Sequence, residues 1–287
     1  MAVAAVSCVL VTPAQATFKG SNGRVAYDVH SKGIADSGAP ESYRALSTVQ
    51  PDGRADRFLR ECQLSGGMAV DGDCAIDYLS PSWSPDATRL VFDTGTRLAL
   101  IGATGTGYAQ LPAVTADDSQ PTFAPSGRKI AFAGRSGGRP DLYTLDLGTR
   151  KATRIARNAA DPDWSSGNRI AFERSGSIYI SDGRGKAVRR LARGRDPGWS
   201  PSGRTLVYAR PGGIYAVAAH GGKARRIVHC SGCSSPVYSP NSKLIAYDGK
   251  GPTVARADNG RTVAKLVGDV SGGGESFDAS NPTWAAR

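Results

Sequence analysis

Histidine is scarce in this chain: there are three in 287 residues. Three histidines leave few candidate residues for a Ser-His-Asp triad or for a zinc site with several imidazole ligands. No apolar run approaches the roughly 18 residues that a membrane-spanning helix needs, which excludes a polytopic membrane protein. Segments with a 3.6-residue apolar period are missing as well, and no Gly-x-x-x-x-Gly-Lys loop for phosphate occurs.

Acidic residues are the minority charge, with 25 Asp and Glu against 36 Lys and Arg, for a net charge of +11. This balance permits nucleic acid, anionic polymers or a membrane surface as partners and selects none of them. The basic runs at 151–156, 187–192 and 223–228 contain no interleaved aromatic residues for stacking on bases. We therefore do not expect nucleic-acid binding.

Charged residues are absent from the first sixteen positions, MAVAAVSCVLVTPAQA, which end in Ala14-Gln15-Ala16. An apolar core followed by an A-x-A site is typical of a secretory signal. We predict a signal peptide over 1–16 and one mature domain over 17–287, exported to the periplasm or the extracellular space. A buried N-terminal strand is the alternative, because the usual basic region before the apolar core is missing.

Cysteine is also rare, and cleavage after Ala16 would leave four: Cys62, Cys74, Cys230 and Cys233. An even number in an exported chain predicts disulfides. Proximity in sequence favours pairing of neighbours, 62 with 74 and 230 with 233. A metal or redox site at 229–233 is the alternative, but it lacks a second cysteine pair or a nearby histidine to complete four ligands.

The most informative feature is an internal repeat of a Pro-x-aromatic-Ser/Ala motif followed by an apolar strand. Its five copies occupy 81–93, 121–133, 162–173, 197–209 and 236–248, with the aromatic anchors Trp83, Phe123, Trp164, Trp199 and Tyr238. The anchors lie 35 to 41 residues apart, close to the length of a four-stranded propeller blade. Short strands and glycine turns continue each copy, so we predict an all-β fold.

The two ends of the chain complete one another. Residues 22–28, NGRVAYD, form a second strand without a preceding anchor, and 281–287, NPTWAAR, form a first strand without a continuation. We predict a six-bladed β-propeller of four-stranded antiparallel blades, closed by the C-terminal strand joining the N-terminal blade. The alternative closure would place Phe18 where Trp284 otherwise lies.

This repeat resembles that of the TolB-type β-propellers, whose core reads Pro-x-Trp-Ser-Pro-Asp-Gly followed by an Ile-Ala-Phe strand. Five copies in register carry the resemblance, with aromatic replacements at Phe123 and Tyr238. It implies an exported, non-enzymatic protein-interaction propeller and names no partner. A separate α/β domain like the amino-terminal domain of TolB is not found, which puts a role in the Tol system in doubt.

Three long insertions, 30–42, 60–80 and 268–280, map to the face that carries the loops leaving the second and fourth strands. Long loops on a rigid scaffold are where binding residues concentrate. Acids gather on the same face, at the end of the second strand or the start of the first. These candidate ligand-binding residues at the channel mouth are Asp28, Asp93, Asp117, Asp118, Asp161, Glu173, Asp196 and Asp248.

Such carboxylates in a basic protein favour a cation or a basic peptide. The alternative is that they cap turns by accepting backbone N–H bonds. No metal residues or resident cofactor are predicted. Ca²⁺ is the one ion considered, because Asp71, Asp73 and Asp77 resemble a loose calcium loop, although the glycine and terminal glutamate of an EF-hand are missing.

Ten lysines and arginines between positions 150 and 226 fall on the predicted outer strands or the turns into them, where basic residues deter edge-to-edge pairing. Adhesion to anionic cell-surface polymers is the functional alternative. The Gly-x-Ser-x-Gly pattern at 134–138 would lie in a hairpin rather than in a strand-to-helix elbow, so no catalytic residue is predicted.

We expect a monomeric, non-enzymatic propeller that binds a protein or cell-envelope component through its loop-rich face. The alternative is a metal-assisted hydrolase or lyase acting on an anionic glycan or phosphoester.

Overall fold

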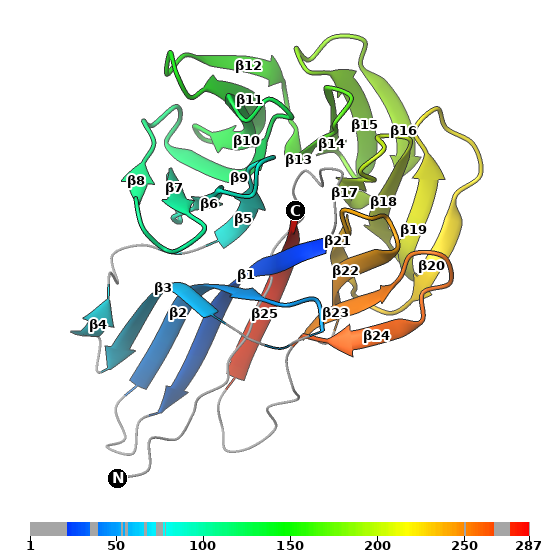
Figure 1. Ribbon diagram of the computed structural model, residues 1–287. Coiled ribbons are helices and arrows are strands. Elements are labelled where there is room, and N and C mark those ends of the chain that lie inside the picture. Colours follow the sequence, from blue (N-terminus) through cyan, green and yellow to red (C-terminus); the bar gives the residue numbers. More distant parts are fainter. Residues whose placement is uncertain are drawn as a thin grey trace.

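The computed structural model describes residues 22–34, 40–52, 54, 57–65, 68–72, 77, 79–249, 251–266 and 276–286. These residues form six antiparallel sheets arranged as the blades of a ring (Figure 1). No α-helix occurs among them, and none of the described segments could cross a membrane as a helix. The six-bladed, all-β propeller predicted from the repeat is confirmed.

Five blades have four strands each, ordered from the inner to the outer edge. The second blade comprises β5 (Leu79–Trp83), β6 (Arg89–Asp93), β7 (Leu98–Gly102) and β8 (Ala109–Gln110). The third comprises β9 (Asp117–Phe123), β10 (Lys129–Arg135), β11 (Asp141–Asp146) and β12 (Ala152–Ala156). The fourth comprises β13 (Ala160–Trp164), β14 (Arg169–Arg174), β15 (Ser177–Asp182) and β16 (Arg189–Arg193). The fifth comprises β17 (Arg195–Trp199), β18 (Thr205–Arg210), β19 (Gly213–Ala218) and β20 (Arg225–His229). The sixth comprises β21 (Ser234–Tyr238), β22 (Leu244–Gly249), β23 (Gly251–Arg256) and β24 (Thr262–Lys265).

The first blade joins the two ends of the described chain. Its five strands, in sheet order, are β25 (Ser276–Ala286), β1 (Asn22–Ile34), β2 (Pro40–Val49), β3 (Arg57–Ser65) and β4 (Met68–Gly72). Strand β25 runs antiparallel to β1, with Trp284 opposite Val25. Trp284 packs with Val25 and with Val237 of the sixth blade. Closure of the ring by the C-terminal strand is therefore confirmed.

The first blade differs from the prediction of long loops. Strand β1 continues to Ile34, and β2 pairs with it up to Pro40. Strand β25 continues the same sheet, with Lys32 opposite Ser276, and β4 adds a fifth strand beside β3. Extra residues at 30–34, 40–42, 60–65, 68–72 and 276–280 thus satisfy backbone groups by strand pairing and lengthen this sheet beyond the others (Figure 1). The rest of these insertions lies largely outside the described residues.

The aromatic anchors form the packing between blades. All six, Trp83, Phe123, Trp164, Trp199, Tyr238 and Trp284, are buried. Phe123, for example, packs with Ile130 of its own blade and with Val91 of the preceding blade. Burial of such a ring removes a large apolar area from water, and the replacements of Trp by Phe or Tyr keep that contribution.

Arginines on the outer strands also connect neighbouring blades. Arg225 of β20 donates to the backbone carbonyls of Asp258 at 2.7 Å and Ala257 at 3.3 Å, both in the sixth blade. Arg189 of β16 makes the equivalent bond to Ala219 of the fifth blade. Protection of sheet edges therefore cannot be the only role of the basic outer strands, because these two side chains fasten one blade to the next.

Candidate functional site

The residue before the proline of each repeat lies at a bulge of the innermost strand. In five blades this residue has a positive φ of 48° to 54°: Ser80, Gln120, Asp161, Asp196 and Ser235. A positive φ is uncommon outside glycine, and the register of each inner strand shifts at this point. The repeat thus places one polar side chain per blade at the same level of the ring.

Two of these residues bond to their counterparts in the next blade. The side-chain oxygen of Gln120 accepts the backbone N–H of Asp161 at 3.1 Å, and its amide nitrogen donates to the Asp161 carboxylate. Asp196 in turn accepts the backbone N–H of Ser235 at 3.1 Å. The bulge therefore fixes these carboxylates relative to the ring.

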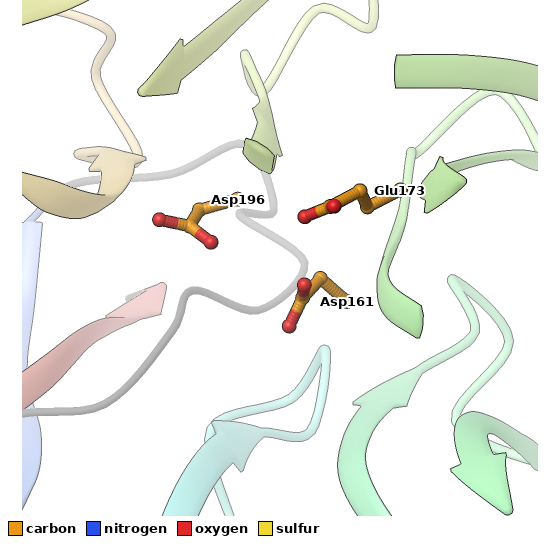
Figure 2. A group of neighbouring side chains, drawn as sticks. All are labelled: Asp161, Glu173 and Asp196. Atoms are coloured by element: carbon orange, nitrogen blue, oxygen red, sulfur yellow. The ribbon is translucent and has the colours of Figure 1, made fainter. Parts of the chain in front are cut away.

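Three of the predicted acids come together between the fourth and fifth blades. Asp161 of β13, Glu173 of β14 and Asp196 of β17 each offer a carboxylate oxygen, and these oxygens lie within 4.8 Å of one another. Figure 2 shows the three side chains lying near one another. Asp196 is buried, whereas Asp161 and Glu173 are half-buried. We call these three residues the acidic cluster.

Loss of solvent raises the pKa of all three groups, and neighbouring acids add to this for Asp161 and Glu173. Burial raises the pKa of Asp161 well above its usual value, and the charges of Asp196 and Glu173 raise it further. Desolvation and the Asp196 charge raise the pKa of Glu173, and burial raises that of Asp196. A cationic group placed among these carboxylates would relieve their mutual repulsion.

One guanidinium partly offsets this negative charge. Arg195 pairs with Asp196 at 2.8 Å and lowers the pKa of all three acids. It also donates to the backbone carbonyl of Cys233 at 3.3 Å. Cys233 is buried and forms a disulfide with Cys230, so the bridged loop supports the arginine.

The remaining predicted acids serve other local roles. Asp118 is buried and accepts the backbone N–H groups of Val114 and Thr115 at 2.8 and 2.9 Å. Asp93 accepts the N–H of Gly95 at 2.7 Å, with Asp117 close enough to raise its pKa. These hydrogen bonds of Asp118 and Asp93 fit the turn-capping alternative.

Asp28 and Asp248 end the second strands of the first and sixth blades. Asp28 is fully buried on β1, opposite Ser280. Asp248 on β22 accepts the hydroxyl of Ser234 at 3.2 Å. Among the described residues, only Asp161, Glu173 and Asp196 form a group of three acids, histidines or cysteines close enough to share a metal ion.

The expected pairing of Cys62 with Cys74 remains a prediction, because Cys74 lies outside the described residues. The same holds for a calcium loop over 71–77, since 73–76 are outside them too. At 134–138, the Gly-x-Ser-x-Gly pattern forms the hairpin from β10 to β11, as expected. His229 lies opposite Gly213, at the end of the fifth blade away from the turn that holds His220.

Sequence reasoning did not single out Gln120, Arg195 or Ser235. A signal for two of them is present in the repeat, because the position before the proline is polar in all five copies. The bond from Arg195 to the Cys233 carbonyl has no such signal, since it depends on how two blades pack.

No family model matches this chain. Curated relatives include a TolB homolog from Chlorobium chlorochromatii, 35% identical over 98 residues, covering 31% of this chain and 22% of the relative. Another is the Tol-Pal system protein TolB of Francisella tularensis subsp. mediasiatica, 25% identical over 238 residues, covering 72% and 54%. The chain therefore spans at most about half the length of these relatives.

Among solved structures, TolB from Acinetobacter baumannii aligns with a TM-score of 0.71 and 22% identity, over 92% of this chain and 67% of that one. An oligogalacturonate lyase in complex with manganese aligns with a TM-score of 0.54 and 14% identity, over 88% and 87%. At these identities the likeness shows the fold alone.

The ring and its sixfold repeat define a closed six-bladed β-propeller. In its repeat motif, its curated relatives and its fold, the chain is similar to TolB-type propellers.

Proposed function

We propose that this chain is an exported, non-enzymatic propeller that binds a protein of the cell envelope at the acidic cluster. The observation that carries the proposal is the grouping of three carboxylates, of which only Asp196 is paired with a guanidinium, that of Arg195. Because this arrangement holds excess negative charge in a basic molecule, it favours a cationic segment of a partner. The TolB and Tol-Pal names of the curated relatives support an envelope setting.

Capture from the native cell envelope tests this proposal. The chain carrying Asp161→Asn with Glu173→Gln is compared with wild type and with a control carrying Asp52→Asn and Asp258→Asn. Both double variants lose two negative charges, but Asp52 and Asp258 lie in exposed turns away from the acidic cluster. We expect the cluster variant to recover less partner than the control. Equal recovery by all three proteins would contradict the proposal.

A metal-assisted hydrolase or lyase is the second candidate, because the three carboxylates could hold a divalent cation such as Ca²⁺. Elemental analysis and calcium titration of the purified protein separate the two functions. Stoichiometric calcium that is lost in the cluster variant, together with cleavage of an anionic glycan or phosphoester, would support the enzyme. The binding function predicts partner capture without any such turnover.

A further inference from the structure

A second feature lies next to the acidic cluster, between the fourth and fifth blades. A cavity of about 460 Å³ opens there, and the residues that line it include Glu173, Arg193, Arg195, Arg210 and Pro211. Its walls come from the β14–β15 and β18–β19 turns and from the link between β16 and β17. We call it the arginine pocket.

Two of its three guanidinium groups are held in place by neighbours. Arg195 is fixed by Asp196 and by the carbonyl of Cys233. The guanidinium carbon of Arg210 lies 3.7 Å from the centre of the Tyr215 ring. An arginine offers five N–H donors, so each group keeps donors for a ligand. Groups held in advance lose less conformational entropy when a ligand binds.

The charge of the pocket is not balanced within the part of the chain that the structure describes. Neither Arg193 nor Arg210 forms an ion pair with any described residue. Glu173 is the only acid that lines the pocket, and it belongs to the acidic cluster as well. Three guanidinium groups and three carboxylates thus meet on one continuous surface, with Glu173 at the boundary.

We propose that the arginine pocket binds a carboxylate side chain of a peptide whose adjacent basic residue enters the acidic cluster. Arginine suits this task because its planar N–H groups match the two oxygens of a carboxylate. A polyuronate could also supply carboxylates, but its uniform negative charge would be repelled by the acidic cluster. A peptide with neighbouring acidic and basic residues complements both halves of the surface. This inference rests on the proposed function and specifies its ligand.

The test is selection of a random dodecapeptide library displayed on phage against the full-length chain. Selected peptides are then measured against Arg193→Gln with Arg210→Gln, and against a control with Arg184→Gln and Arg190→Gln. Both variants lose two positive charges, but Arg184 and Arg190 lie outside the pocket and are exposed. Arg195 is left unchanged because it also holds Asp196. Thermal unfolding confirms that each variant is folded.

We expect the selected peptides to carry an acidic residue beside a basic one. Loss of charge-assisted hydrogen bonds should weaken their binding to the pocket variant roughly ten- to a hundredfold, whereas the control should bind as wild type does. Failure of the selection, selected peptides without acidic residues, or equal binding by both variants would overturn the proposal. Preferential binding of trigalacturonate would also overturn it and would assign the pocket to a glycan.

The capture experiment keeps the two proposals apart. If envelope capture depends on the acidic cluster but not on Arg193 and Arg210, the proposed function stands and the peptide pocket fails. If capture depends on neither set, the proposed function fails as well.

Discussion

Replacement of Asp93 by asparagine should stabilise the protein at neutral pH and leave it unchanged in acid. Asp93 ends β6 and is 5% exposed. Burial raises its pKa from 3.8 to about 7, with Asp117 and Asp77 adding repulsion and the Gly95 N–H opposing the shift. Asparagine keeps an oxygen for that N–H and carries no charge to bury.

The sign and size of the effect follow from the two protonation states. Above pH 4 the unfolded chain releases the proton of Asp93, whereas the folded protein retains it up to about pH 7. Between these values the free energy of unfolding of the wild type therefore decreases as the pH rises. A shift of about three pKa units corresponds to at most about 4 kcal/mol, and relaxation around the site should reduce this to roughly 2 kcal/mol.

Guanidinium denaturation at pH 4.5, 6, 7 and 8 measures the effect. We expect D93N and wild type to differ little at the lowest pH and to diverge up to pH 8, with D93N the more stable. The variant D258N removes the same charge from an exposed turn and reports the effect of net charge alone. Parallel profiles for D93N and wild type would refute the argument from burial.

Two further predictions concern packing between blades. Asp163→Ala should lower the free energy of unfolding by about 1.5–3 kcal/mol. The Asp163 carboxylate accepts the buried N–H of Trp199 at 2.5 Å, and alanine would leave that N–H without its partner. An unchanged denaturation midpoint would contradict this prediction. Gly260→Ala should destabilise by about 1–3 kcal/mol in the same assay, since its Cβ would lie 2.0 Å from the carbonyl oxygen of Ile227. Gly221→Ala is the matched control, because its φ of +103° is also positive and nothing lies within 4 Å of the added carbon. An equal loss of stability in both variants would show that backbone strain rather than the contact is responsible.

The fold could be predicted from the sequence because its signals are local. Each blade carries an aromatic anchor and a short apolar strand, so the spacing of Trp83, Phe123 and Trp164 already defines the repeat. Closure of the ring could be predicted in the same way, because the first and last segments of the chain each carry part of one blade. The extension of the first blade could not be predicted, since glycine- and serine-rich residues at 30–42 and 268–280 resemble loops. Pairing between β1 and β25 depends on segments about 250 residues apart in the chain.

The candidate site was predictable only in part. Blade register placed Asp161, Glu173 and Asp196 on one face, but the same reasoning included Asp118, which caps a neighbouring loop. Distinguishing these acids requires the hydrogen bonds around each carboxylate. The contribution of Arg195 depends on contacts between blades, which a repeat pattern does not encode.

The pairing of β25 with β1 has a consequence for the timing of folding. The first blade lacks its inner strand until residues 276–286 have been synthesised, so the ring cannot close before then. Strand pairing over such a sequence separation is slow, because a long segment must be ordered before the contact forms. A nascent chain that has not reached residue 276 thus stays open, with the inner edge of its first blade unpaired.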